Sequence, residues 1–364
     1  MLAIKLILFF IALIVTALYA VNLALAAKVP SLPEADSAHY KKARFHNTTP
    51  TPNMPFLKTV ALWIRFFTEK KVNTTPDVEI PVRPLSKIAL AALSHNELHI
   101  IKLGHSSVLL KVYGEYWLLD PVFSERASPF SFAGPKRFHQ PPIALRDLPT
   151  IDKVLISHNH YDHLDKSSIT ILANKTREFF VPKGVDGDLK KWGVESSKIT
   201  VFDWWQERQT KQGMVVFTPS QHFSGRGLSD GNRTLWGSWV IKTPQQNLYF
   251  SGDSGYFSGF KEIGDRYGPF DLTMIETGAY DKDWASIHMT PEESVQTHLD
   301  LKGKVMVPIH NGTFDLAFHA WYDPFNRVVA EAERRAVALS TPEFGQIFTI
   351  TDAPIENPWW RVSS

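Results

Sequence analysis

The sequence predicts an α/β protein with one large, strand-rich domain. From Leu98 onward, short apolar runs alternate with turn residues, which is the pattern of buried strands. Helical patterns fall between some of these runs, and we find no repeat of fixed period. With 364 residues, 44% of them hydrophobic and 21% charged, the chain has the composition of a globular protein with a sizeable core.

The predicted strands are apolar runs bounded by glycine, proline, asparagine or charged residues. They are His99–Leu103, Ser107–Val112, Tyr116–Asp120, Lys153–Ser157, Arg177–Val181, Lys198–Phe202, Met214–Thr218, Ser238–Thr243, Asn247–Ser251, Leu272–Glu276 and Val305–Pro308. The predicted helices are Ser167–Asn174, Pro291–Leu301 and Pro324–Ala338. The second has a strong start, because proline suits the first turn and Glu292 and Glu293 complement the helix dipole.

The N-terminus carries an apolar run from Leu6 to Ala27 that follows Lys5 and is close to the length needed to cross a bilayer. The run ends in Ala24-Leu25-Ala26, which is similar to a signal-peptidase site. Residues 1–27 are therefore expected to be a signal peptide or a membrane anchor. The protein would be membrane-associated through this segment, or exported if it is cleaved. The flanking charges leave the side of the membrane open.

Residues 28–97 are predicted to form a proline-rich arm ahead of the main domain. Within the arm, Leu57–Lys71 has the pattern of a short amphipathic helix. It either rests on lipid or packs on the main domain, and the second interpretation is favoured. The expected division is thus a leader at 1–27, the arm at 28–97, the main domain at 98–352 and a C-terminal tail at 353–364.

Charge and cysteine content exclude some functions. The net charge of +2 and the absence of a basic stripe argue against a nucleic-acid partner. The chain has no cysteine, so disulfides and thiolate metal ligands are excluded. A metal ion would have to be bound by histidine, aspartate or glutamate side chains.

The strongest motif follows the predicted strand at 153–157. His158, His160, Asp162 and His163 lie within six residues, directly after a buried run. Spacing of two places His158 and His160 on one side of an extended segment, where they can chelate one ion. Asp162 and His163 point elsewhere and can hold a second ion. The sequence therefore predicts a metal site at this strand end.

Three further candidate ligands come after later strands. His222 follows the strand at 214–218, Asp253 follows the strand at 247–251, and His310 follows the strand at 305–308. Each alone would more often be a structural histidine or a turn aspartate. Their shared position after strand ends favours the metal-ligand interpretation.

The pattern HxHxDH…His…Asp…His resembles that of the metallo-β-lactamase superfamily, and longer stretches are similar to the N-acylphosphatidylethanolamine phospholipase D family. This resemblance implies an αββα sandwich, with two mixed β-sheets flanked by helices and two zinc ions in a cleft at one edge. The stretches that carry it are LGHSSVLL (103–110), LLDPVFSERASPFSFAGPKRF (118–138), LISHNHYDHLD (155–165), SGDSGYFSGFKEIG (251–264), GPFDLTMIETGAY (268–280), HMTPEESVQTHLDL (288–301) and PIHNGTF (308–314).

The resemblance also implies a role for each site residue. The first zinc would be bound by His158, His160 and His222, the second by Asp162, His163 and His310, and Asp253 would bridge them. His288 matches a family histidine beside the nucleophile and the substrate phosphate, so Asp162 and His288 are the residues expected to take part in catalysis. Two features depart from the family pattern. Asn311 stands where many members have tryptophan, and the stretch Asp315–Asp323 differs from the usual ending.

The function that the resemblance implies is that of a zinc-dependent phosphodiesterase that hydrolyses a phospholipid such as N-acylphosphatidylethanolamine on the phospholipase D side. A hydroxide bridging the two ions, roughly 3.5–4 Å apart, would attack phosphorus. Lys136 and Arg137 either meet the headgroup or form a solvated turn. The alternatives are a metal-dependent lactonase or esterase on the same fold and a membrane-tethered binding protein. The expected partners are a phospholipid and the membrane surface, and a homodimer is left open.

Overall fold

The computed structural model describes residues 16–17, 19–27, 29, 37–51 and 55–361. Most of the predicted leader, residues 1–15 and 18, lies outside this range. Residues 19–25 are helical. Over the part of the chain that is described, no helix is both long and apolar enough to cross a membrane.

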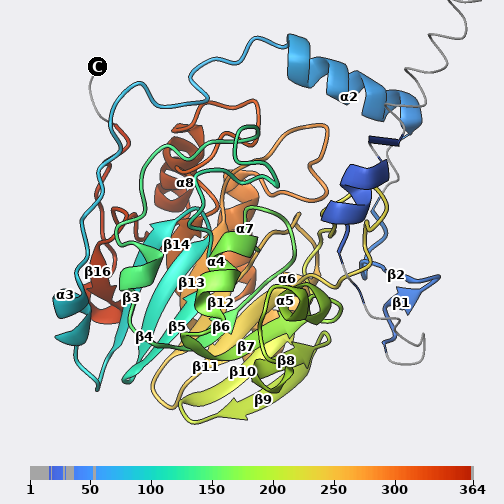
Figure 1. Cartoon of the computed structure of the whole chain (residues 1–364). Helices are drawn as coiled ribbons and strands as arrows, with labels where there is room; N and C mark the ends of the chain where they lie inside the picture. Colours follow the sequence, from blue (N-terminus) through green and yellow to red (C-terminus); the bar gives the residue numbers. More distant parts are fainter. Residues whose placement is uncertain (1–15, 18, 28, 30–36, 52–54, 362–364) are drawn as a thin grey trace, which may run out of the picture.

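Two seven-stranded mixed sheets form the centre of the domain (Figure 1). The first has the order β16-β3-β4-β5-β6-β7-β8, and its strands β5 to β8 are parallel to one another. Its strands are β3 (Leu98–Gly104), β4 (Ser107–Val112), β5 (Glu115–Leu119), β6 (Ile151–Leu155), β7 (Thr176–Pro182), β8 (Ile199–Phe202) and β16 (Ile347–Thr349).

The second sheet has the order β15-β14-β13-β12-β11-β10-β9, with β12 to β15 parallel. Its strands are β9 (Gln206–Thr210), β10 (Gly213–Thr218), β11 (Ser238–Lys242), β12 (Asn247–Phe250), β13 (Phe270–Glu276), β14 (Gly303–Ile309) and β15 (Ala338–Leu339). A separate two-stranded ribbon pairs β1 (Tyr40–Lys41) with β2 (Arg44–Phe45).

The helices and the short 3₁₀ turns lie between the strands in sequence. The helices are α2 (Phe56–Thr68), α3 (Lys87–Ala91), α4 (Lys166–Leu172), α5 (Asp186–Lys191), α6 (Gly259–Tyr267), α7 (Pro291–Asp300) and α8 (Asp323–Arg334). The 3₁₀ turns are Leu145–Asp147, Ser196–Lys198 and Ile350–Asp352. Helix α7 begins where proline and two acids predicted it, with Thr290 and Glu293 forming a capping box.

Three buried clusters show how these elements are layered. The largest lies between the sheets and joins residues of both, such as Trp117 from β5 and Trp239 from β11. A second covers the outer face of the first sheet and includes Ile169 and Leu172 of α4 and Leu189 of α5. The third covers the outer face of the second sheet and includes Phe260 of α6, Val295 of α7 and Val328 of α8. Helices therefore flank both sheets, and the predicted αββα sandwich is confirmed.

The strand directions bring one end of each sheet to a common edge. In the first sheet, β3, β5 and β6 run the same way, because the antiparallel strand β4 lies between β3 and β5. In the second sheet, β10, β12, β13 and β14 likewise run together. A bridge between His105 and Asn311 joins the two edges. The loops at the carboxyl ends of these seven strands can therefore share one site.

Helix α2 contains most of the helix predicted in the arm, and it packs on the main domain through one side. Arg65 pairs with Asp281 and Asp283, and the Phe66 ring lies 4.7 Å from that of Phe318. These contacts confirm that α2 packs on the main domain, and they involve only one side of the helix. The opposite side leaves Leu57 exposed by 79%, together with Val60 and Ile64, so an apolar stripe of α2 faces solvent.

The tail and the arm both contact the main domain. Trp359 and Trp360 are buried against Phe325 of α8. From the arm, Val82 forms a bridge with Phe344.

Candidate metal centre

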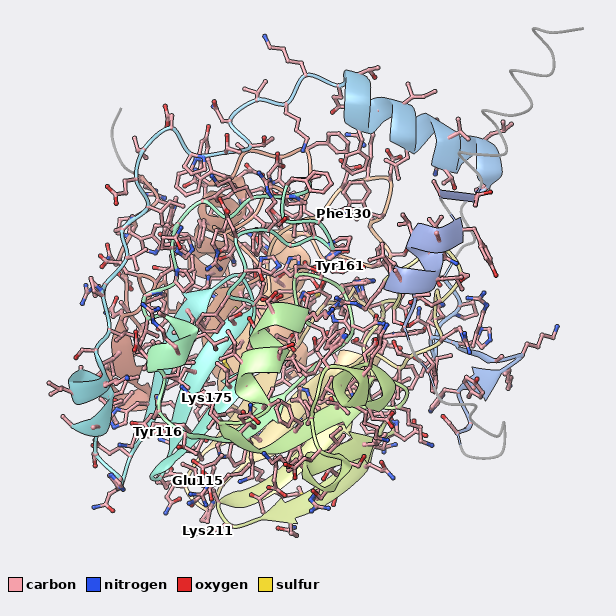
Figure 2. The ribbon with its side chains drawn as sticks, viewed as in Figure 1. Glu115, Tyr116, Phe130, Tyr161, Lys175 and Lys211 are labelled. Carbon is pink, nitrogen blue, oxygen red and sulfur yellow. The ribbon has the colours of Figure 1, made fainter. Side chains whose placement is uncertain are left out.

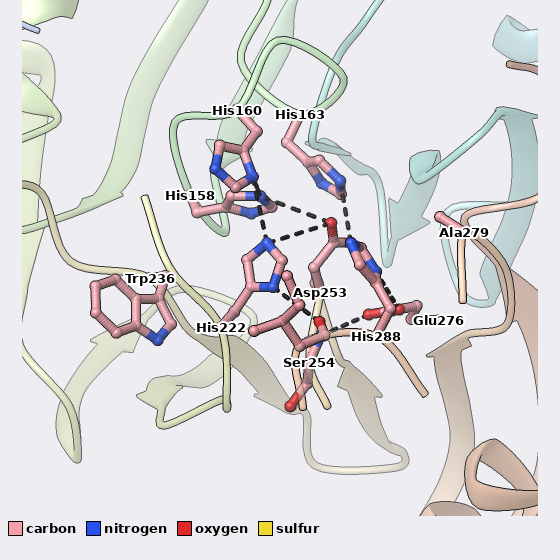
Figure 3. A network of polar contacts seen from close by, with 12 residues as sticks. His158, His160, His163, His222, Trp236, Asp253, Ser254, Glu276, Ala279 and His288 are labelled. Atoms are coloured by element: carbon pink, nitrogen blue, oxygen red, sulfur yellow. Dashed lines mark hydrogen bonds and ion pairs between the residues drawn. The ribbon is translucent and has the colours of Figure 1, made fainter. Parts of the chain in front are cut away.

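Loops from both sheets bring histidine and aspartate side chains together at the common edge. Figure 3 shows imidazole rings gathered around the carboxylate of Asp253. Within the described residues, the donor atoms form three groups whose members lie within 4.8 Å of one another. The groups are His158, His160, His222 and Asp253; His105, Asp162, His163 and His310; and Asp253, His288 and His310.

The donor atoms of the first group are spaced like the ligands of a tetrahedral metal ion. Nδ1 of His160 lies 2.9 Å from Nε2 of His158 and 3.2 Å from Nε2 of His222. Both Nε2 atoms lie 3.7 Å from Oδ2 of Asp253. Ligand atoms around a tetrahedral zinc at about 2.0–2.1 Å are roughly 3.3 Å apart. The four donors therefore surround a space of the right size for one divalent cation.

The second group is built in the same way around Asp162. Nε2 of His310 lies 3.2 Å from Oδ2 of Asp162 and 3.1 Å from Oδ2 of Asp253. Nε2 of His163 lies 3.0 Å from Oδ1 of Asp253. Asp253 thus faces both groups, which is the position of a bridging carboxylate.

The hydrogen bonds of two rings show which nitrogen atom faces the other donors of the site. Nδ1 of His222 lies 2.9 Å from the carbonyl oxygen of Ile287, which can only accept, so in the neutral ring Nδ1 carries the proton and Nε2 is free to bind a metal. Nδ1 of His163 lies 2.7 Å from Oδ2 of Asp120, and its Nε2 faces Oδ1 of Asp253. Burial alone would lower the pKa of His163, but Asp253 and Asp162 outweigh it and hold the pKa well above its usual range. The carboxylates therefore call for a positive charge that a divalent cation would supply, so the donor set fits a metal.

The pKa values of the site histidines also show that the buried carboxylates favour positive charge beside them. Burial lowers the pKa of His160 and of His222 to about 3, so both are neutral at pH 7 as ligands must be. Burial would also lower the pKa of His310, but Asp253 and Asp162 outweigh it and raise the pKa to about 10. Divalent cations would take over the role of such protons.

The backbone at the site is constrained. His105, Asp120 and His310 have φ angles of 48°, 39° and 62°, and a left-handed residue other than glycine costs roughly 1–3 kcal/mol. Hydrogen bonds hold these turns: His310 N donates to His105 O over 3.1 Å, and His105 N donates to Thr313 Oγ1 over 2.6 Å. The fold thus holds the ligands in place before an ion binds.

All seven residues predicted as metal ligands lie in the first two groups. They are His158, His160, Asp162, His163, His222, Asp253 and His310. His288 also lies at the site, with its ring centroid 5.1 Å from that of His222 and 5.2 Å from that of His310.

The structure adds three residues that the sequence did not single out. Nε2 of His105 lies 3.0 Å from Oδ2 of Asp162. Asp120, buried after β5, orients His163 and accepts hydrogen bonds from Ser157 N and Oγ. Glu276, the last residue of β13, has Oε1 2.6 Å from Nδ1 of His288. Asp120 and Glu276 therefore fix the rings of a predicted ligand and a predicted catalytic residue.

Lys136 and Arg137, two basic residues of the stretch at 118–138, have different surroundings. Lys136 is exposed and pairs with Glu125 over 3.0 Å, as a residue of a solvated turn does. Arg137 is buried over the ring of Phe314. Asn311, one of the two departures from the family pattern, accepts a hydrogen bond from the buried amine of Lys102. Lys102 therefore ties the segment after His310 to β3.

The fold and the donor set define a metal-dependent hydrolase of the metallo-β-lactamase class. A profile of the β-lactamase superfamily domain matches residues 116–311. A metallo-hydrolase from Ignicoccus hospitalis has a similar structure, with a TM-score of 0.54 at 21% identity, covering 69% of this chain and 97% of the other.

Two curated relatives share most of their length with this chain. An uncharacterized protein of Mycobacterium tuberculosis is 44% identical over 289 residues, which is 77% of each chain. The N-acyl-phosphatidylethanolamine-hydrolyzing phospholipase D 1 of Caenorhabditis elegans is 35% identical over 267 residues, covering 69% of this chain and 75% of the relative. The chain belongs to the β-lactamase superfamily and, within it, to the family of N-acyl-phosphatidylethanolamine-hydrolysing phospholipases D.

Proposed function

We propose that this hydrolase is a zinc phosphodiesterase that cleaves a phospholipid such as N-acylphosphatidylethanolamine on the phospholipase D side, releasing phosphatidate and the headgroup alcohol. The observation that carries the proposal is the position of His288. It lies at the metal centre, is held by Glu276, and belongs to neither of the two four-residue donor groups. A histidine placed in this way is available for the substrate.

The cofactor in this proposal is a pair of divalent ions. His158, His160 and His222 would hold one, Asp162, His163 and His310 the other, and Asp253 would contact both. Nitrogen and carboxylate donors in tetrahedral spacing favour zinc among common cations. When bound, the ions would supply a nucleophile at neutral pH and Lewis-acid stabilisation of phosphoryl oxygens.

Side chains of this protein would bind the substrate, transfer a proton and orient a metal ligand. His288 would bind a phosphoryl oxygen or give a proton to the departing headgroup oxygen through Nε2, because Nδ1 is occupied by Glu276. Asp120 would keep Nε2 of His163 unprotonated by accepting the proton of Nδ1. Phe223, which is 40% exposed, lies over His160 and borders the accessible side of the site.

A lipid substrate is supported by the exposed apolar residues of α2. Leu57, Val60 and Ile64 form a stripe on a helix that contacts the loop at 281–284, and His288 follows this loop closely in the chain. We propose that this stripe rests on a membrane, because an exposed apolar helix face beside basic residues suits a lipid interface. If the N-terminal segment is retained, it would add to the attachment as an anchor; if it is cleaved, it would act as an export signal instead.

The competing activity is that of a lactonase or another esterase, since the same fold and metal ligands serve carbonyl substrates. A protein loaded with zinc should be assayed on labelled N-acylphosphatidylethanolamine and on a panel of lactones. We expect turnover of the phospholipid with loss of at least 10²-fold in His288→Asn. Turnover of lactones alone would favour the competing activity.

A further inference from the structure

The loop that follows the predicted ligand His222 is organised by one buried carboxylate. Asp230 is fully buried, and its Oδ2 accepts hydrogen bonds from Arg226 N over 3.0 Å and from Ala27 N over 2.7 Å. Its Oδ1 accepts from Gly227 N over 2.7 Å. One side chain therefore joins the N-terminal segment to the segment at 226–230.

The N-terminal segment contacts the same loop at a second point. Leu228 N donates to Oδ1 of Asn22 over 2.7 Å, and Nδ2 of Asn22 donates to Ser229 Oγ over 2.9 Å. The backbones are closely packed here: a Cβ on Gly227 would lie 2.8 Å from Oδ1 of Asn22 and 3.0 Å from Cα of Ala26. A side chain at position 227 would displace the segment.

On its other side, the loop contacts the segment that carries four predicted metal ligands. The half-buried Arg226 donates from Nη1 to Asn159 O over 2.8 Å and to Leu164 O over 2.7 Å. In the sequence, these two carbonyl groups lie on either side of His160, Asp162 and His163. Tyr161 completes the contact, because its hydroxyl donates to Arg226 O over 2.8 Å and its ring lies 4.0 Å below the guanidinium.

Tyr161 lies at the same end of the molecule as Phe130 (Figure 2). Both border a groove of about 540 Å³ that is also lined by Ala24, Leu25 and Arg226. The N-terminal segment and the ligand-bearing loop thus lie on one surface, and the contacts through Asp230 and Arg226 are continuous between them.

We propose that residues Asn22–Ala27 are part of the apparatus that positions the metal-binding loop, acting through Asp230 and Arg226. None of these residues belongs to the three donor groups found among the described residues, so we treat them as positioning residues. The inference goes beyond the phosphodiesterase assignment, because it concerns the loop at 158–164 whatever the substrate is. It requires that Asn22 remains in the active protein.

The test measures the loop and the metal rather than turnover. In Asn22→Ala and in Arg226→Lys, we expect amide hydrogen exchange at 158–164 in the metal-free protein to quicken by about tenfold and zinc affinity to fall by a similar factor. Because both changes act on one chain of contacts, the double variant should lose less than the product of the single effects. Val21→Ala, at a neighbouring exposed residue, and Arg177→Met, at an exposed arginine, are the matched controls.

Three results would overturn the proposal. The first is unchanged exchange and zinc affinity in Asn22→Ala, and the second is strictly additive effects in the double variant. The third is a mature protein of full zinc affinity whose mass shows that it starts at Ala27. If Arg226→Lys does not fold, Gly227→Ala tests the same coupling from the other side of the contact. Failure of the phospholipase assay would leave these measurements unaffected.

Discussion

Nδ1 of His288 lies 2.6 Å from Oε1 of Glu276, and the second oxygen of this fully buried carboxyl accepts a hydrogen bond from Ser254 N. Ser254 follows Asp253, the residue that faces both groups of metal donors. Glu276 therefore fixes the ring of His288 and the turn of Asp253 relative to one another. Burial raises the pKa of Glu276 above its ordinary value and lowers the pKa of His288 to about 4.

The first prediction concerns this pair. His288→Asn should lower kcat/KM on a phosphodiester by about 10²-fold or more, because a positioned hydrogen-bond donor or acid is lost. Glu276→Gln keeps the shape of the carboxyl and should cost about tenfold, mainly in kcat, with KM changed little. Zinc content should stay at the wild-type level in both variants. Loss of one zinc equivalent in His288→Asn would instead make His288 a ligand, as its contact group with Asp253 and His310 allows.

The second prediction concerns the metal content. The purified protein should carry close to two equivalents of zinc, and Asp253→Ala should lower this number because Asp253 faces both donor groups. Chelation should lower Tm, since the buried carboxylates then lose their cations. Metal analysis after gel filtration and a thermal melt are the measurements. A folded, metal-free protein that takes up no ion on titration would contradict the prediction.

The parts of the fold that sequence predicts are those with apolar periodicity. All eleven predicted strands are present within a few residues of their expected bounds. Strand β9 was not predicted, because Gln206–Thr210 is polar and mostly exposed and becomes a strand only by pairing with β10. Helix α6 was not predicted either. Its Gly264 lowers helix propensity, yet a Cβ there would lie 2.2 Å from Asp300 O, so packing against the end of α7 requires glycine.

The candidate site likewise contains residues that the sequence predicts and residues that it does not. The ligands after strand ends could be predicted, because histidine and aspartate are conspicuous there. Asp120 and Glu276 were placed within predicted strands, although each lies at a strand end and the same rule would have selected it. Their roles depend on contacts with residues 43 and 12 positions away along the chain. Such contacts follow from the sheet order, which periodicity does not give.

The third prediction concerns the exposed stripe of α2. Leu57→Ser and Ile64→Ser should each weaken binding to phospholipid vesicles by about tenfold, because each removes an apolar side chain that the lipid would cover. Vesicle co-sedimentation of metal-loaded protein is the measurement, with Tm as the check on folding. Ile171→Ser, at an exposed isoleucine of α4, is the control. Equal loss in all three variants would contradict a specific lipid-facing stripe.

The fourth prediction concerns stability at acidic pH. Burial lowers the pKa of His298 to about 4, and its Nδ1 lies 2.7 Å from Thr273 Oγ1. Below pH 6.5 the unfolded chain takes up a proton that the folded protein does not. Stability is therefore lost as the pH falls from about 6.5 to about 4, by about 3 kcal/mol in total from this group.

The measurement for this prediction is chemical unfolding of the metal-free protein at a series of pH values. His298→Gln removes the titrating group, so its unfolding free energy should fall less steeply between pH 6.5 and 4 than that of the wild type. His95→Gln, at an exposed histidine, should follow the wild-type curve. Parallel curves for wild type and His298→Gln would show that His298 does not contribute this dependence.

The central claim, hydrolysis of a phospholipid at phosphorus, is tested most directly by the fate of solvent oxygen. N-acylphosphatidylethanolamine should be hydrolysed by the zinc-loaded protein in ¹⁸O-labelled water, and the products analysed by mass spectrometry. Attack at phosphorus places the label in phosphatidate and leaves the N-acylethanolamine unlabelled. Label in a free fatty acid, or in the N-acylethanolamine, would contradict the proposed reaction.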